Sequence, residues 1–225
     1  MATSTVENYL KAILLRSGEN SGIVPTGILA EALGVTPGTT TTMVKAMAAQ
    51  GLLEHLPREG VQLTETGRDV ALGVLRKHRL VETFLVRVLK MDWAAVHEEA
   101  EALEHAISDG VLERIDALLG HPSSDPHGDP IPGATAELFP ARGSTTLATC
   151  PSDKSLRVTR IADQTPAFLE FVQQSGLKPG ARVRVSRRDR ASGVVYCDLS
   201  RGHAATLGLP EAAKIEVGEP SKSAF

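Results

Sequence analysis

The stretch Val96–Asp109 (VHEEAEALEHAISD) constrains the fold of this chain most, because it has the period of a helix without the chemistry of a core helix. At 3.6 residues per turn, His97, Glu101, Glu104 and His105 fall on one helical face. A core-facing helix would place Leu, Ile or Val along such a stripe. Carboxylates are costly to bury unless they are paired or coordinate a metal ion. A fold that buries this face must therefore supply a counter-charge.

A second polar pair precedes this stretch. His78 and Glu82 stand four residues apart in KHRLVETFL, on one face of the preceding predicted helix. Imidazole and carboxylate together make a mixed N/O set that suits a divalent cation. Either set alone is better explained as a solvated helix face, since Glu and His are common on surfaces. Two such sets so close in sequence favour a metal site.

The N-terminal seventy residues predict a winged helix-turn-helix. Helices are expected over Val6–Arg16, Pro25–Leu33 and Thr36–Gln50, where Thr36-Pro37 is a strong helix start. A tight hairpin follows over Leu52–Leu63. This order of elements, with a short glycine turn before the third helix, is typical of a DNA-binding module.

The third predicted helix would enter the major groove of DNA. We place Thr39, Thr40, Thr42 and Lys45 on its outer face, since hydroxyls and a cation contact phosphates and thymine methyls. Arg58, in the hairpin turn, is added as a further DNA contact. The alternative is that the threonines form only a solvated face. Residues 1–70 hold 5 Lys/Arg against 7 Asp/Glu, which is unlike a free-standing DNA binder.

The middle of the chain is acidic and helical. Residues 71–150 hold 12 Asp/Glu against 7 Lys/Arg. Helices are expected over Glu65–Leu89, Asp92–Ile107 and Val111–Leu119, with more apolar surface than one chain can bury. We expect this apolar surface to be buried in a two-fold homodimer interface, and the homodimer to bind a palindromic DNA site. The net negative charge of the chain argues against DNA binding. The two would be compatible if the protein bound DNA only when its acidic part holds a metal ion.

Residues 120–147 are rich in Pro, Gly and Ser and predict a linker. Within DPHGDPIPG, alternate residues including Asp125 and His127 could face one point, although turn residues are the simpler interpretation. Beyond it, a short helix is expected over Pro166–Gln174. Strands are expected over Leu156–Ile161, Ala181–Ser186, Gly193–Leu199 and Ala213–Val217, which predicts a small β-barrel.

The predicted fold class is therefore mainly α with a small β domain. We assign residues 1–70 to a winged helix-turn-helix domain, 71–140 to a helical metal-binding and dimerisation domain, 141–150 to a linker and 151–225 to a β-barrel domain. No apolar run reaches the length of a membrane span and no signal pattern opens the chain, so we expect no membrane partner. Cys150 and Cys197 lie outside any CxxC spacing, which fits a reducing cytoplasm.

Six motifs resemble the DtxR/MntR family of metal-dependent transcriptional repressors. They are YLKAI, AEALGVTPGTTTTMVKAMAAQGL, LTETG, KHRLVETFL, VHEEAEALEH and DPHGDPIPG, in the family's order over residues 5–135. The C-terminal part resembles the family's SH3-like, FeoA-type domain. The manganese-responsive branch is the closer match.

The resemblance assigns a primary metal site. Glu101, Glu104 and His105 match its ligands, with His78 nearby. Asn8 stands where manganese members usually have Asp and iron members Met. Its amide oxygen can still coordinate, but it lacks the charge. Lys11 stands where some members place a further ligand, which argues against a dinuclear site.

The resemblance also implies a second metal site and a DNA-reading surface. Glu82, Asp125, His127 and Asp163 resemble a site that ties the C-terminal domain to the core, and His97 matches an ancillary ligand of iron-type members. The residues that match the DNA-reading helix are Thr36, Gly38, Thr39, Thr40 and Thr42.

The expected function is metal-activated repression of metal-homeostasis genes, by a cytoplasmic homodimer that binds palindromic double-stranded operator DNA. Hard O/N ligands suit Mn(II), with Fe(II) as the alternative, and Zn(II) or Co(II) are expected to substitute in vitro. Filling the primary site would fix the DNA module relative to its dimer mate.

Three alternatives stay open. One is an iron-dependent regulator of the same family, and another is a DNA-binding protein that needs no metal. The third is a metal-dependent hydrolase, which would need an open coordination position, a general base and a substrate pocket. No separate base is apparent in the sequence. We therefore expect no enzyme activity, no catalytic residue and no small-molecule substrate.

Overall fold

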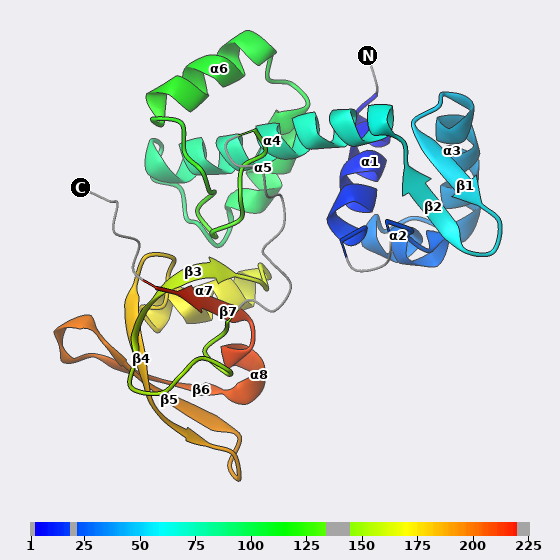
Figure 1. Cartoon of the computed structure of the whole chain (residues 1–225). Coiled ribbons are helices and arrows are strands. Elements are labelled where there is room, and N and C mark those ends of the chain that lie inside the picture. Colours follow the sequence, from blue (N-terminus) through cyan, green and yellow to red (C-terminus); the bar gives the residue numbers. More distant parts are fainter. Residues whose placement is uncertain (1–2, 19–21, 134–144, 220–225) are drawn as a thin grey trace. The chain divides into compact units, whose positions relative to one another are not determined.

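The computed structural model describes residues 3–18, 22–133 and 145–219 (Figure 1). Two compact units divide the chain. One is Met1–His78 with Glu101–Arg114, and the other is Arg79–Ala100 with Ile115–Phe225. Contact density thus joins the segment after Ala100 to the N-terminal module, whereas the sequence interpretation keeps all of 71–140 in one domain. That domain division stays a prediction.

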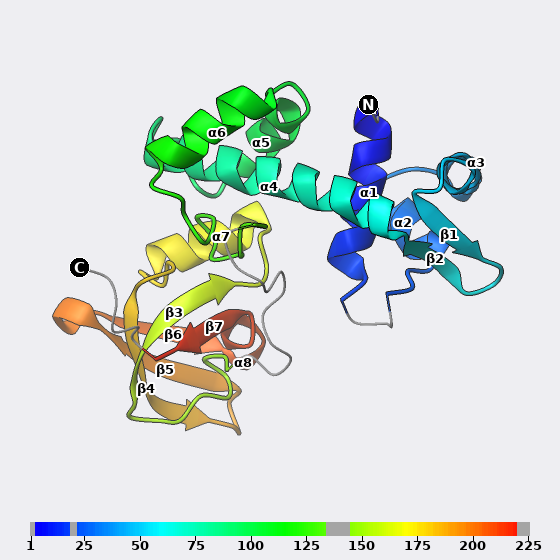
Figure 2. The same cartoon turned by 45° about the horizontal axis from the view of Figure 1, so that its top comes forward.

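The first unit opens with the three helices and hairpin of a winged helix-turn-helix. These are α1 (Ser4–Arg16), α2 (Thr26–Ala32), α3 (Pro37–Ala49), β1 (Leu53–Leu56) and β2 (Gly60–Leu63). Thr36 caps α3, because its hydroxyl accepts the Thr39 N–H at 3.2 Å, and Pro37 fixes the first turn. β1 pairs antiparallel with β2; β1 packs against α3 and β2 against α1 (Figure 2).

The helical middle follows as α4 (Glu65–Arg87), α5 (Val96–Glu104) and α6 (Asp109–Leu118). The LTETG motif sets the start of α4: the Thr64 hydroxyl accepts the Gly67 N–H at 3.1 Å and donates to the Gly51 carbonyl at 2.7 Å. A Cβ at Gly67 would lie 1.8 Å from the Leu52 carbonyl oxygen, so only glycine allows this close approach. The helix predicted over Asp92–Ile107 is shorter than expected, and His105 lies just beyond its last turn.

The β domain lies in the second unit. Its sheet is antiparallel in the order β6-β5-β4-β3-β7. The strands are β3 (Ser155–Ile161), β4 (Arg182–Asp189), β5 (Val194–Leu199), β6 (Ala204–Gly208) and β7 (Ile215–Gly218), accompanied by α7 (Pro166–Gln174), the short 3-10 turn η1 (Ser200–Gly202) and α8 (Leu209–Ala212). The sequence analysis missed β6, because small residues dominate it and give little alternation of large apolar side chains.

One hydrophobic core unites this unit. Trp93 and Ala94, from the segment between α4 and α5, are buried together with barrel residues such as Leu156 and Val158. The predicted fold class, helical with a small SH3-like β domain, is confirmed. No described helix is long and apolar enough to cross a membrane.

Candidate metal centre

Three side chains converge at a buried point of the second unit. Glu82 comes from α4, and Asp125 and His127 come from the loop that follows α6. Their donor atoms all lie within 4.8 Å of one another, and the three residues are only 1%, 4% and 1% exposed. Two carboxylates and an imidazole at this spacing form a donor set for a divalent cation.

The imidazole of His127 is prepared to donate a lone pair. Its Nε2–H donates to the carbonyl oxygen of Trp93 at 2.9 Å, which leaves Nδ1 as the unprotonated nitrogen of a neutral ring. Nδ1 is buried, has no hydrogen-bond partner among the described atoms and lies 3.8 Å from Glu82 Oε2. Trp93 also stacks on the ring at a centroid distance of 5.2 Å. A histidine held this way through one nitrogen presents the other to a metal ion.

The carboxyl group of Asp125 has too little positive charge around it to favour its ionised form. Burial raises its pKa well above the ordinary value, and the nearby carboxylates of Asp129 and Glu82 raise it further. The guanidinium of Arg79, 3.8 Å away, only partly offsets this. A cation beside Asp125 would favour its ionised form, so the cluster fits a metal ion both by donor geometry and by charge.

The loop that carries Asp125 and His127 is rigid. Asp125 Oδ1 accepts the N–H groups of His127 and Asp129, each at 2.9 Å, so its other oxygen remains for further contacts. Arg160 donates to Asp129 at 2.6 Å and to Glu216 at 2.7 Å. These partly buried ion pairs fix the position of the loop on the β domain.

The loop also meets β3 through its backbone. The carbonyl of His127 accepts the Ile161 N–H at 2.9 Å. Gly128 has φ +95°, and a Cβ there would lie 2.0 Å from the Thr159 carbonyl oxygen. Asp125 and Trp93 also line a surface pocket of about 410 Å³. Asp125 therefore belongs both to the donor group and to the lining of this pocket.

Two other predicted ligands lie differently. His97 is exposed on α5, and its Nδ1 lies 3.1 Å from Glu82 Oε1, so it approaches one ligand of the cluster. Asp163 is not part of the group: it accepts the ammonium of Lys214 at 2.8 Å and the N–H of Thr165 at 3.0 Å. Burial would raise the pKa of Asp163, but these hydrogen bonds outweigh it and hold that pKa below its ordinary value.

The remaining predicted ligands gather in the first unit, between α1 and the end of α5. Glu104 is buried; its Oε1 accepts Lys11 Nζ at 2.6 Å and its Oε2 lies 2.6 Å from His78 Nδ1. Glu101 Oε1 accepts the same ammonium at 2.6 Å. Burial alone would raise the pKa of Glu104, but the hydrogen bonds and charges of His78 and Lys11 hold it below its ordinary value.

His105 completes this set from the other side. Its Nδ1 lies 2.6 Å from Glu7 Oε2, and its Nε2 lies 2.7 Å from Asn8 Oδ1 and 3.4 Å from Glu104 Oε1. Sequence reasoning missed Glu7, although its place beside Asn8 on the first helix could have indicated it. The structure therefore brings together five predicted ligands around Lys11, which already contacts two of them, Glu101 and Glu104. The five are Asn8, His78, Glu101, Glu104 and His105.

The candidate DNA-reading surface is the exposed side of α3, with its N-cap, and the hairpin tip. Thr36, Gly38, Thr39, Thr42 and Lys45 are exposed there, and Arg58 is exposed at the tip with φ +71°.

The placement of Thr40 on the outer face is wrong. It is fully buried, and its hydroxyl donates to the Thr36 carbonyl at 3.2 Å. With Val44 and Met47 it falls at i, i+4 and i+7, the stripe that packs into the module.

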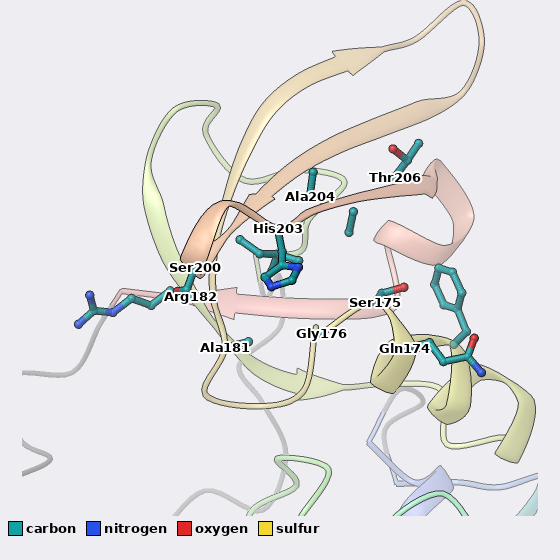
Figure 3. A pocket seen from close by; sticks show the side chains of 12 residues that line it. Gln174, Ser175, Gly176, Ala181, Arg182, Ser200, His203, Ala204 and Thr206 are labelled. Carbon is teal, nitrogen blue, oxygen red and sulfur yellow. The ribbon is translucent and has the colours of Figure 1, made fainter.

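A larger pocket, of about 640 Å³, opens on the β domain, where Figure 3 shows His203 near its centre and Arg182 extending away from it. None of its lining residues belongs to a group of three or more metal donors among the described residues. We therefore place the metal chemistry elsewhere.

Comparison with known proteins adds to this geometry. Residues 1–61 match the model of the iron dependent repressor N-terminal DNA-binding domain, residues 64–133 that of the iron dependent repressor metal-binding and dimerisation domain, and residues 145–219 that of the FeoA domain. The iron-dependent repressor IdeR of Mycobacterium leprae is 33% identical over 198 residues, which cover 80% of this chain and 83% of that protein.

Solved structures agree. A manganese-dependent transcriptional repressor in complex with manganese is 39% identical, with a TM-score of 0.81 over 96% of this chain and 100% of that one. ScaR with bound Cd²⁺ is 31% identical, with a TM-score of 0.74 over 96% and 99% of the two chains.

Proposed function

This chain belongs to the DtxR/MntR family of metal-dependent transcriptional repressors, and from that premise we propose that it represses transcription by binding operator DNA as a metal-activated homodimer. The observation that carries the metal dependence is the buried group of Glu82, Asp125 and His127. His127 Nδ1, which has no hydrogen-bond partner among the described atoms, and the carboxyl of Asp125, whose pKa is raised, both suit a group to which a cation would add positive charge. A bound divalent ion supplies that charge and fixes the three side chains together.

We propose Mn(II) as the metal. The donors are oxygen and imidazole nitrogen, and no cysteine or methionine is among them, so soft-metal selectivity has no basis here. Fe(II) is the alternative, and Zn(II) or Co(II) would substitute in vitro, since intrinsic affinity rises along the divalent series. His97 would assist through Glu82, to which its ring is close.

The set around Asn8, His78, Glu101, Glu104 and His105 is the second candidate for metal. Its fit is poorer than that of the buried cluster, because Lys11 already neutralises charge on both carboxylates. An ion there would have to displace or share the lysine contacts. Asp163 would join the buried cluster only by giving up its ion pair with Lys214.

We propose that α3 enters the major groove. Thr36, Gly38, Thr39 and Thr42 are exposed near its N-terminus, where backbone N–H groups favour phosphate. Lys45 and the hairpin residue Arg58 would contact the DNA backbone. No catalytic role is assigned to any residue, and the expected site of action is the cytoplasm.

Homodimerisation is supported by uncovered apolar side chains on the middle helices. Val88 and Leu89 follow α4, Leu103 is on α5, and Val111 and Leu118 are on α6; these five residues are 38–66% exposed. Within each compact unit taken by itself, apolar side chains at these exposures are expected where a second copy covers them. A two-fold dimer would present two reader helices to a palindromic operator.

The test is DNA binding by chelated protein on a palindromic duplex, at fixed salt, with Mn(II), Fe(II) and Mg(II) added separately. We expect tight binding with Mn(II), weaker activation by Fe(II) and none by Mg(II). A chelated protein that binds the duplex as tightly as the Mn(II) form would overturn the proposal and leave a metal-independent DNA-binding protein. Equal activation by all three ions would overturn the assignment of Mn(II).

A further inference from the structure

Lys11 occupies an unusual place for a lysine. It lies on α1 with 6% of its surface exposed, and its ammonium lies 2.6 Å from Glu101 Oε1 and 2.6 Å from Glu104 Oε1. Lysine is almost never fully buried unless it is paired. Here one cation contacts two carboxylates that a single helix, α5, presents one turn apart.

The arrangement reproduces what a divalent ion does between protein elements. An ion that bridges carboxylates of one helix and a donor of another holds the two elements together. The Lys11 ammonium makes the same connection between α1 and α5, and the second oxygen of Glu104 is occupied by His78. Because the lysine is covalently attached to α1, its local concentration does not depend on the metal supply.

We propose that Lys11 is a resident cation that closes the junction between α1 and α5 in place of a metal ion. The DNA-binding module and the end of α5 are then held together whether or not metal is present. The metal-responsive step is confined to Glu82, Asp125 and His127, with one ion bound per chain. This second part rests on the proposed function, whereas the first part does not.

Three observations support the contrast between the two sites. The segment Glu101–Arg114 belongs to one compact unit with Met1–His78, and within this unit the Lys11 ammonium contacts Glu101 and Glu104 directly. Around Lys11, Glu101 Oε1 and both carboxylate oxygens of Glu104 face an ammonium or imidazole nitrogen. In the buried cluster, by contrast, His127 Nδ1 has no hydrogen-bond partner in the part of the chain that the structure describes.

The experiment compares the thermal unfolding of full-length Lys11→Met with that of wild type, each in chelator and in Mn(II). Removing the ammonium leaves Glu101 and buried Glu104 facing each other with less counter-charge, so we expect the chelated variant to unfold roughly 5–15 °C lower. Added Mn(II) should then raise its unfolding temperature more than it raises that of wild type. The matched control is Lys77→Met, which removes a partly exposed ion pair with Asp109 in the same unit and should change little.

A double variant separates charge from packing. Adding Glu101→Gln to Lys11→Met removes one of the two facing carboxylates, so it should recover part of the lost stability of the chelated protein. Recovery supports the resident cation, and so does a Lys11→Met protein that folds only with Mn(II). If Lys11→Met unfolds like Lys77→Met, or if Glu101→Gln lowers its stability further, the proposal is overturned.

The number of bound ions tests the second part. Equilibrium dialysis should give one Mn(II) per chain for wild type and an additional ion for Lys11→Met, whose α5 carboxylates are released. Two ions per wild-type chain, with Lys11 in place, would overturn the confinement of the metal to the buried cluster. Absence of any Mn(II) binding by wild type would overturn the proposed function instead, and the unfolding of the chelated variants would still decide the role of Lys11.

Discussion

The carbonyl oxygen of His127 accepts a hydrogen bond of 2.9 Å from the backbone N–H of Ile161, so a candidate metal ligand is attached to strand β3 of the β domain. Asp125, two residues earlier, belongs to the same rigid loop. Two of the three buried donors are therefore held in place by the β domain. Substitutions in this domain should change metal affinity even where no ligand is replaced.

Asp125→Asn should separate stability from metal binding. The ionised carboxylate of Asp125 is disfavoured by burial and by neighbouring carboxylates, so a neutral amide in its place should raise the stability of the chelated protein. The same change should weaken Mn(II) binding on the order of 100-fold, as measured by calorimetry. Asp198→Asn is the matched control, since Asp198 forms an exposed pair with Arg184, and it should leave Mn(II) affinity unchanged. A chelated Asp125→Asn protein that is less stable than wild type would contradict this account.

Arg160→Gln should weaken metal binding through Asp129. Arg160 donates to Asp129 at 2.6 Å, and Asp129 holds the loop that carries Asp125 and His127. We expect Mn(II) affinity to fall about 10-fold, with the same number of ions bound. Arg184→Gln, which removes an exposed pair with Asp198 on the same domain, should have no effect. Equal affinities for the two variants would show that the loop does not need Arg160.

Gly128→Ala should be far more damaging than Gly180→Ala. Both glycines have positive φ, of +95° and +90°, so the backbone strain is similar. A Cβ at Gly128 would lie 2.0 Å from the Thr159 carbonyl oxygen, whereas nothing lies within 4 Å of one at Gly180. We expect losses of roughly 3–5 kcal/mol and about 1 kcal/mol, respectively, by denaturant unfolding. Similar losses would mean that the loop can move away from β3.

Lys45→Ala should lower operator affinity equally for all sequences. Lys45 is exposed on α3, where a cation would contact phosphate. The slope of log affinity against log salt should fall by about 1 for each half-site, measured by fluorescence anisotropy with Mn(II) present. Thr42→Val on the same face should instead change the preference among operator sequences. A change in sequence preference on Lys45→Ala, with an unaltered salt slope, would place that side chain on the bases.

Alkaline conditions should destabilise the β domain through Cys197. Burial raises the pKa of this thiol to about 11 from an ordinary value of 9.0. The unfolded chain then loses its thiol proton first, so the stability is fully present below about pH 9 and declines as the pH rises towards about 11. The decline due to this group should be about 1–2 kcal/mol and should be absent in Cys197→Val, measured by denaturant unfolding between pH 8 and 11. Rapid reaction of the native protein with a thiol reagent at neutral pH would contradict the burial of the thiol.

Much of the fold follows from local sequence signals. Thr36-Pro37 marks the start of α3, and LTETG marks the start of α4, because a capping hydroxyl and a glycine act within one helical turn. For this reason the predicted helix boundaries of the winged helix-turn-helix lie close to the observed ones. Strand β6 is missed by the sequence analysis because it is defined by its pairing with β5, and its alanine and glycine residues have no strong preference for a strand. The sequence analysis misplaced Thr40, although the sequence already shows its i, i+4, i+7 spacing with Val44 and Met47.

The sequence by itself determined that imidazoles and carboxylates recur with a helical period over Val96–Asp109, because a period of 3.6 residues is a local property. Only the tertiary structure decided which charge each carboxylate meets. Lys11 reaches Glu101 and Glu104 across about ninety residues of sequence, whereas Asp125 meets Glu82 in a buried space with an unpaired imidazole nitrogen. Coulomb energy depends on distance through space and desolvation depends on burial, and neither is set by position along the chain.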